Sequence, residues 1–196
     1  MRLFVVPVAL CAAVAVPAAA QEANTTDSIA RDGVRIEARA TYETPTVSSI
    51  EEDDDVYKLG SAFAFGGEVG FDLAVSNSVV VGPYGQYEVS SVESCEEGFC
   101  VSTTDYLEAG LHIGVALNAE GQLFGKLGYG QLGFETSGLG LDSTETGEGV
   151  AFAAGYEHGF GDTFYGSVEL GYADLGDVYG INFQRRHAGV TVGARF

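Results

Sequence analysis

The chain has 196 residues and a formal net charge of −19, because 28 acidic residues stand against nine lysines and arginines. So few basic residues exclude nucleic-acid binding through phosphates, which needs clustered Lys and Arg. The 28 glycines, twelve phenylalanines and ten tyrosines, with no tryptophan and one methionine, argue against a helix-rich protein.

Residues 1–20 have the form of a secretory signal peptide. Arg2 gives a positive start, the stretch Leu3 to Pro17 is almost wholly apolar, and three alanines ending at Ala20 provide a cleavage site. A transmembrane anchor is the alternative, but a spanning helix needs about 20 apolar residues and polar residues follow here at once. We expect cleavage after Ala20 and a mature chain that forms one domain.

The main signal after residue 32 is alternation of apolar with small or polar residues over eight segments. In the clearest one, 107–117, Leu107, Leu111 and Ile113 share one face, while Glu108 and His112 share the other. Segments of roughly ten alternating residues are the signature of a transmembrane barrel. The eight segments are 34–42, 63–73, 79–89, 107–117, 123–129, 150–157, 164–172 and 187–196.

The connections alternate in length. Short turns are expected near 75–77, 118–121 and 159–162, and longer loops at about 44–60, 91–104, 135–149 and 174–181. Short turns on one side and long loops on the other are the barrel arrangement, and an even strand count places both termini on the turn side. Near Phe183 the last segment is out of phase, which predicts a bulge there.

A secreted β-sandwich also alternates, and the second face of the segments decides against it. A sandwich turns a strongly polar face to water, whereas this face is mostly Gly and Ala with about one ionisable residue per segment. Small residues with sparse charges suit a narrow lumen that side chains fill. The predicted fold is all-β, an eight-stranded antiparallel transmembrane up-and-down β-barrel.

Charged residues predicted to face the lumen should neutralise one another, because buried charges are tolerated only when paired and hydrogen-bonded. The pattern supports two interpretations, a structural salt-bridge core or a gated polar path for ions and small solutes. A permanently open pore is disfavoured, since eight strands enclose little more than their own side chains. The predicted network comprises Arg35, Glu37, Arg39, Glu68, Glu88, Glu108, His112, Lys126, Glu157, Glu169, Arg185 and Arg195, with His187 nearby.

With Cys11 in the signal segment, Cys95 and Cys100 remain. An exported chain meets an oxidising compartment, so we expect a disulfide between them. A thiol pair or metal ligands are the alternatives, but no histidine lies nearby in the sequence.

Negative charge concentrates in the predicted long loops. Carboxylates could bind calcium, but a run of adjacent acids without a defined loop geometry is more commonly a solvated tip. We therefore expect no metal and no cofactor. These acids are the run 51–55, Glu93, Glu96, Glu97, Asp142, Glu145 and Glu148.

The candidates for a catalytic base are the three histidines, His112, His158 and His187. None has a Ser or Asp partner at a spacing that suggests a catalytic triad. We expect no enzymatic activity; a lipid-modifying or peptide-cleaving barrel is the weak alternative.

Together, the signal peptide, the eight segments, the strand entry Val81-Gly82-Pro83-Tyr84 and the stretch 190–196 (VTVGARF) resemble the small outer-membrane β-barrel family, the OmpA/OmpX-type, porin-like barrels. The resemblance implies a Gram-negative outer membrane, a periplasmic tail over 21–32 and a barrel over 33–196. It implies Phe196 as the signal read by the outer-membrane assembly machinery, and contact with outer-membrane lipid and lipopolysaccharide.

From this resemblance we expect a structural and surface-interaction role, with acidic extracellular loops that could meet an extracellular partner. The alternative is a low-conductance pore for small hydrophilic solutes.

Overall fold

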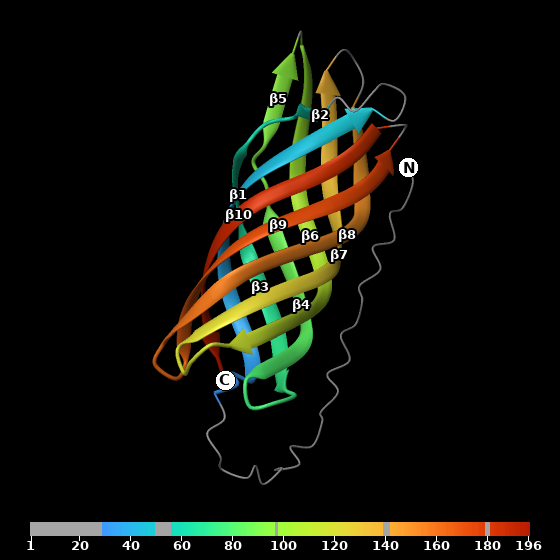
Figure 1. Ribbon diagram of the computed structural model, residues 1–196. Helices are drawn as coiled ribbons and strands as arrows, with labels where there is room; N and C mark the ends of the chain where they lie inside the picture. The colour runs from blue at the N-terminus through green and yellow to red at the C-terminus, as the bar shows by residue number, and fades with distance from the viewer. Residues whose placement is uncertain (1–28, 50–55, 97, 139–141, 179–180) are drawn as a thin grey trace, which may run out of the picture.

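The computed structural model describes residues 29–49, 56–96, 98–138, 142–178 and 181–196, and its regular elements are ten β-strands (Figure 1). No helix in these ranges is long and apolar enough to cross a membrane. Two strands are short, β2 (Val56–Lys58) and β5 (Glu93–Glu96). The eight long strands are β1 (Gly33–Ser49), β3 (Ala62–Ala74), β4 (Val79–Val89), β6 (Phe99–Ala116), β7 (Gly121–Gly138), β8 (Ser143–Phe160), β9 (Phe164–Val178) and β10 (Ile181–Arg195).

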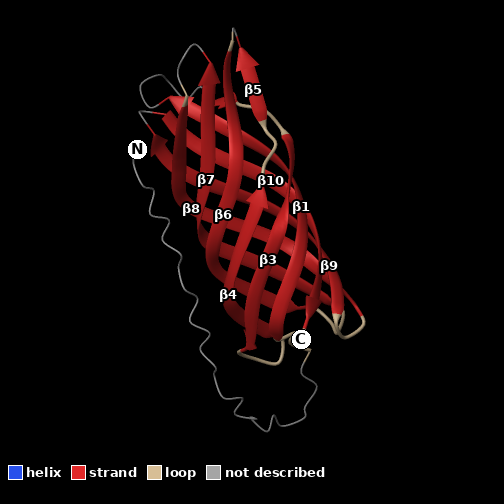
Figure 2. Cartoon of the chain, turned by 180° about the vertical axis from the view of Figure 1, so that it is seen from behind, coloured by secondary structure: helices blue, strands red, loops and turns tan. Residues whose placement is uncertain are grey.

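The long strands form a closed ring in chain order, each antiparallel to its neighbours. Closure is made by β1 and β10, whose pairing runs from Arg35 opposite Arg195 to Ser49 opposite Ile181. Figure 2 shows the wall from behind, again as tilted neighbouring strands. The predicted eight-stranded up-and-down barrel is confirmed. We call the end with the short connections and Arg195 the turn end, and the end with β2 and β5 the loop end.

The strands run farther toward the loop end than the alternation predicts. Each of β6, β7 and β8 has 18 residues, so much of the predicted loops 91–104 and 135–149 is strand. Pairing of β7 with β8 continues to Thr136 opposite Ser143. Outward residues there are polar, so the difference between apolar outward and polar inward residues disappears, while the backbone hydrogen bonds between strands continue. The bulge expected near Phe183 is confirmed by a register shift between Asn182 and Gln184.

The barrel is apolar outside and charged inside. On β6, Leu107 and Leu111 face outward with 48% and 58% of their surface exposed, whereas Glu108 and His112 are buried. The outward apolar run from Leu107 to Leu117 spans ~33 Å of extended chain, which at barrel tilt matches an apolar band about 25 Å tall. Because a soluble sandwich would expose its charges and bury its large apolar side chains, this distribution excludes the sandwich alternative.

Two glycines of β4 provide a test of how tightly the wall is packed. A Cβ at Gly82 would overlap the carbonyl oxygen of Phe71 on β3, whereas at Gly85 the nearest atom, Glu108 O, would lie 3.9 Å away. Gly82→Ala should therefore force the backbone apart and lower the free energy of unfolding by about 3 kcal/mol. Gly85→Ala is the matched control and should stay within about 0.5 kcal/mol. Urea unfolding in lipid vesicles measures both, and equal effects would contradict the packing described.

Candidate functional site: an ion-paired lumen

All twelve side chains of the charge network proposed from the sequence are buried inside the ring. The buried acidic and basic side chains there comprise eight carboxylates, five lysines and arginines, and two histidines. Unpaired, such groups would each cost several kcal/mol to remove from water. Their contacts therefore determine whether the interior is a stable core or a path for solutes.

Lys126 joins opposite walls at the middle of the lumen. Its Nζ lies 2.6 Å from Glu68 Oε2 on β3 and 2.7 Å from Glu169 Oε2 on β9. Neither strand is a hydrogen-bonded neighbour of β7, which carries the lysine. Lys126 also lies over the ring of Tyr84, 5.3 Å from its centroid. A single side chain thus crosses the space that a pore would have to leave open.

Arg39 on β1 connects three carboxylates around this lysine. Its guanidinium nitrogens lie 3.0 Å from Glu68, 3.0 Å from Glu88 and 2.7 Å from Glu169. Because Glu68 and Glu169 also bind Lys126, charges of opposite sign alternate through the middle of the barrel. Charge-assisted hydrogen bonds of this kind satisfy several lone pairs at once.

Arg35 continues the network toward the turn end. It lies 2.6 Å from Glu37 Oε1, 3.2 Å from Glu68 Oε1 and 2.8 Å from Asp72 Oδ2. The hydroxyl of Tyr165 donates to Glu37 at 2.8 Å. The middle layer is thereby connected to the charges below it without a break.

At the turn end, Arg195 lies between two carboxylates, 2.8 Å from Glu157 and 3.3 Å from Asp72. The Nδ1 atom of His112 lies 2.9 Å from Asp72 Oδ1. Arg31, from the segment that precedes β1, reaches to 3.5 Å from Glu157. The described part of the predicted tail therefore takes part in closing this end, which the sequence pattern did not indicate.

Toward the loop end, Arg185 forms ion pairs with Glu43 and Glu88. Its Cζ lies 4.0 Å from the centroid of the Tyr106 ring, a cation–π contact. The alternating pattern does not predict a strand face for Glu43, because Glu43 follows the last apolar residue of its segment.

Above Arg185 the lumen becomes apolar. The rings of Phe134 on β7 and Phe183 on β10 meet with centroids 4.2 Å apart, and these strands are not neighbours. The contact therefore crosses the lumen. We call this cluster the stopper; its members are Tyr106, Leu132, Phe134, Ala151, Ala173 and Leu175, with Leu59 and Phe183 packed against them.

Glu108 differs from the expectation that each lumen charge meets an opposite one. Its carboxylate accepts hydrogen bonds from the hydroxyls of Tyr84 and Tyr106 and from Gln86 Nε2 at 3.4 Å. No basic side chain of the described chain forms an ion pair with it. Two phenols and an amide satisfy the carboxylate instead, and these neutral partners leave no charge pattern in the sequence.

The remaining histidines form no catalytic arrangement in the described part of the chain. His187 contacts Glu169 at 3.1 Å inside the lumen. His158 lies near the turn end, where its ring is close to those of Tyr156 and Phe160. No serine or threonine hydroxyl of the described residues hydrogen-bonds to a histidine.

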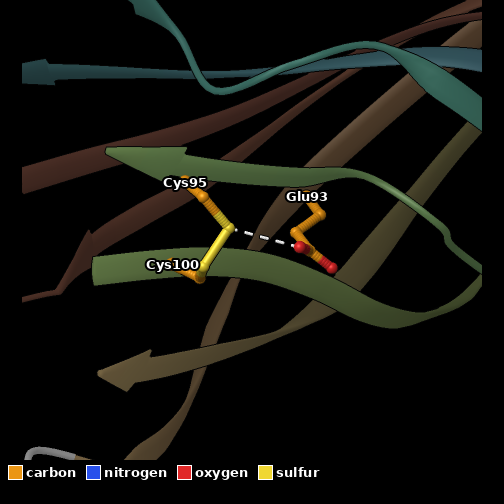
Figure 3. A group of neighbouring side chains, drawn as sticks. All are labelled: Glu93, Cys95 and Cys100. Carbon is orange, nitrogen blue, oxygen red and sulfur yellow. Dashed lines mark hydrogen bonds between the residues drawn. A yellow bond between two sulfur atoms is a disulfide. The ribbon is translucent and has the colours of Figure 1, made fainter. Parts of the chain in front are cut away.

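The disulfide between Cys95 and Cys100 is present, with an S–S distance of 2.00 Å, which confirms the predicted pairing. The two residues lie directly opposite each other in the β5–β6 hairpin. Glu93 Oε1 lies 3.2 Å from Cys95 Sγ (Figure 3). Although these three groups lie within 4.8 Å of one another, disulfide sulfurs lack the thiolate that binds metals.

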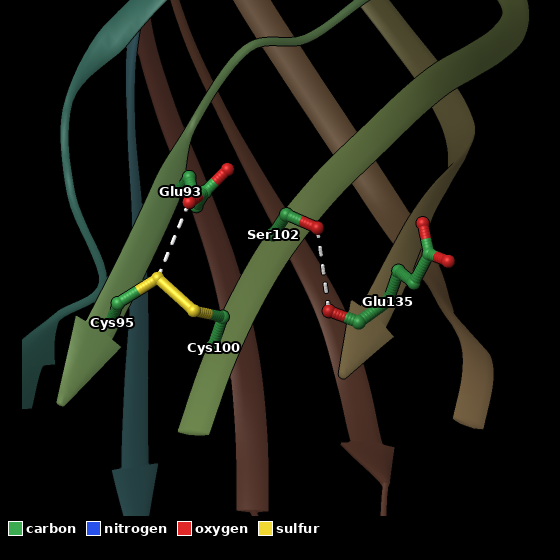
Figure 4. The surroundings of a disulfide bond; sticks show 5 residues. All are labelled: Glu93, Cys95, Cys100, Ser102 and Glu135. Carbon is green, nitrogen blue, oxygen red and sulfur yellow. Dashed lines mark hydrogen bonds between the residues drawn. A yellow bond between two sulfur atoms is a disulfide. The ribbon is translucent and has the colours of Figure 1, made fainter. Parts of the chain in front are cut away.

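Only the β5 half of this hairpin lies off the ring, since β5 pairs with β6 alone while β6 also pairs with β7, so the disulfide should matter locally. Ser102 Oγ donates to the carbonyl of Glu135 on β7 at 3.4 Å (Figure 4), in addition to the backbone pairing of β6 with β7. Replacing Cys95 and Cys100 by serine should destabilise the hairpin by about 2 kcal/mol and increase proteolysis there. The unfolding free energy of the ring should stay unchanged. A fall in that value would show that the hairpin belongs to the barrel's cooperative unit.

The acidic residues proposed for the loops lie partly in described regions. Glu93, Asp142 and Glu148 are exposed at the loop end, and Glu145 is half-buried. The run 51–55, Glu97 and the side chain of Glu96 lie outside the described residues, as does the predicted signal peptide.

Comparison with known proteins agrees with this architecture. A family model for the outer membrane protein β-barrel domain matches residues 6–196, and no curated protein sequence matches the chain. Ail, the attachment invasion locus protein of Yersinia pestis, superposes with a TM-score of 0.53 at 14% identity, covering 83% of this chain and 99% of Ail. Neisserial surface protein A gives 0.52 at 15%, covering 84% and 97%. OprG of Pseudomonas aeruginosa gives 0.51 at 11%, covering 87% and 99%.

Proposed function

The chain belongs to the outer membrane protein β-barrel domain family, and we propose that within the outer membrane it serves as a closed structural barrel that presents acidic loops to surface partners. The contact of Phe134 with Phe183 across the lumen carries the proposal. With Lys126 bridging β3 and β9 below it, the interior is occupied at two levels. A barrel whose lumen is filled by its own side chains suits a structural and surface-interaction role and does not suit the conduction of solutes.

The orientation that we propose places the loop end outside the cell and the turn end in the periplasm. Long loops outside and short turns inside are usual for such barrels. Exposed acids at the loop end, Glu93 and Glu148 among them, would then meet extracellular partners of opposite charge, and Phe196 at the turn end would face the assembly machinery. The structural neighbours include proteins named for attachment and for the bacterial surface, in keeping with this role.

A strain that lacks the protein tests both parts of the role. We expect greater uptake of a hydrophobic dye across its outer membrane, restored by the wild-type chain. A variant with Glu93→Gln and Glu148→Gln should restore the barrier but weaken binding of cells to a cationic surface. Unchanged dye uptake together with unchanged surface binding in the deletion strain would refute the proposal.

The low-conductance pore is the second candidate, and the polar lumen below the stopper favours it. Swelling of liposomes in small sugars separates the two functions. The closed barrel predicts the swelling rate of protein-free liposomes, whereas a pore predicts faster swelling that falls as the solute grows. An enzymatic role has no support in the described histidine contacts, and we propose none.

A further inference from the structure

The chain has nine basic residues, and the lumen accounts for most of them. Five are buried in the charge network, Arg31 pairs with Glu157 at the turn end, and Arg2 lies outside the described residues. The two that remain are Lys58 and Arg186. Neither forms an ion pair with a described residue, and the polar contact of Arg186 is a 3.5 Å hydrogen bond from its Nη2 to Gln184 Oε1.

Lys58 and Arg186 flank the same strand on the outside of the loop end. Lys58 on β2 lies opposite Thr46 of β1, and Arg186 on β10 lies opposite Thr44; both side chains are exposed. Figure 1 shows β1 and β10 side by side along this face. Two strand spacings across and two residues along give a Cα separation of roughly 12 Å. The two exposed cations are therefore neighbours.

An apolar groove of about 860 Å³ lies on the outer wall of the barrel, on the turn-end side of Arg186. Its upper rim is formed by Tyr42 and Phe63, whose rings make an edge contact at 5.3 Å. Ala188, two residues from Arg186 and on the same face of β10, lines it with Ala40 and Ala154. Small side chains thus lie between larger ones, and together they line a hollow in the outer wall of the barrel.

We propose that Lys58, Arg186 and this groove form a site for lipid A, the bis-phosphorylated, acylated disaccharide of the outer leaflet. The two cations would each meet one phosphate, and an acyl chain would lie in the groove. A lipid with two separated phosphates matches two separated cations better than a lipid with one. Clustered basic residues next to an apolar surface are the usual means of binding anionic lipid. The site rests on the orientation proposed above, but not on whether the lumen conducts.

Nearby acidic residues reduce the net positive charge of this site. Asp174 lies opposite Gln184 on the outward face of β9, and its Oδ1 accepts a hydrogen bond from Gly176 N at 3.3 Å. The acidic run 51–55, outside the described residues, directly precedes β2 in the sequence. We therefore expect Asp174→Asn to strengthen binding of phosphorylated lipid, a sign opposite to that of the cation variants.

The test measures binding of purified lipid A to the refolded full chain in detergent by native mass spectrometry. Wild-type protein should retain lipid A at least about tenfold more strongly than the Lys58→Gln, Arg186→Gln double variant. Ala188→Phe, which fills the groove, should also weaken retention. Gln131→Ala, an exposed change on β7 outside the groove, is the matched control and should bind like wild type. Gel migration with and without heating confirms that each variant is folded.

Comparisons on the wild-type chain keep the test decisive even if a variant fails to fold. Dephosphorylated lipid A should bind at least about tenfold more weakly than the bis-phosphorylated form, and phosphatidylglycerol should be intermediate. Equal binding of the two lipid A forms would overturn the phosphate contacts. Equal binding of phosphatidylglycerol would overturn the assignment to lipid A. Sucrose octasulfate, the heparin analogue bound to Ail in one crystal structure, has no acyl chain; if it bound as tightly as lipid A, the groove's role would be refuted.

Discussion

Arg39→Met is expected to lower the free energy of unfolding by about 3–5 kcal/mol, among the largest effects of any single change in the barrel. The substitution keeps much of the side-chain volume but removes the cation that three buried carboxylates share. Removing one partner of a buried ion pair leaves an uncompensated charge, which costs more than the pair itself contributed. Urea unfolding in lipid vesicles, followed by tyrosine fluorescence, measures the loss.

Ala38→Met is the matched control for this change. Ala38 is on the same strand but faces outward and is exposed, so a longer apolar side chain there meets lipid and should change the free energy by less than about 0.5 kcal/mol. If both variants unfolded at the same urea concentration as the wild type, the ion pairs around Arg39 would contribute nothing to stability.

Phe134→Ala should cost a similar amount, about 3–5 kcal/mol, for a different reason. Phe134 is 3% exposed in the stopper and touches Phe183 across the lumen. Truncating a buried aromatic ring removes its burial and leaves a cavity that the surrounding wall fills only partly.

The same change at an outward aromatic position provides the comparison. Phe152→Ala removes a ring that is 54% exposed on the outside of β8, and it should cost clearly less in the same urea titration. A cost for Phe134→Ala below that of Phe152→Ala would mean that the stopper is loosely packed and that the lumen is open at the loop end.

The parts of the fold that depend on contact with lipid could be predicted from the sequence. Where the outside of the wall meets hydrocarbon, each outward residue must be apolar, so alternation located all eight strands and most of their inward charges; Glu43 and Asp72 are the exceptions. Farther toward the loop end, outward residues such as Glu135 and Glu148 face water, and the pattern loses its contrast. The strands continue there because backbone pairing does not need apolar side chains.

The stopper was missed for this reason, although one signal was available. Phe134 and Leu132 have the same parity as Lys126 along β7, so extending the phase of that strand would have pointed both side chains inward. Tyr106 lies next to a register shift between Thr103 and Tyr106, where parity counting fails. Contacts between strands that are not neighbours, such as Phe134 with Phe183, depend on barrel closure and leave no local pattern.

Pairing within the charge network could be predicted as a principle but not residue by residue. The sequence identifies most of the lumen charges, yet the partners of Glu108 are two phenols and an amide. Arg31 joins the network from a segment interpreted as a tail. Which groups meet inside a barrel is determined by strand register and shear, and neither leaves a trace in alternation alone.

Single-channel recording of the refolded protein in a planar bilayer tests the closed lumen most directly. Lys126 and Arg195 lie in successive layers of the ion-paired core. The filled barrel predicts no discrete channel events for the wild type, and it predicts that Lys126→Ala and Arg195→Ala lower the unfolding free energy. Reproducible channel events in the wild type, with a conductance that either substitution changes, would contradict it.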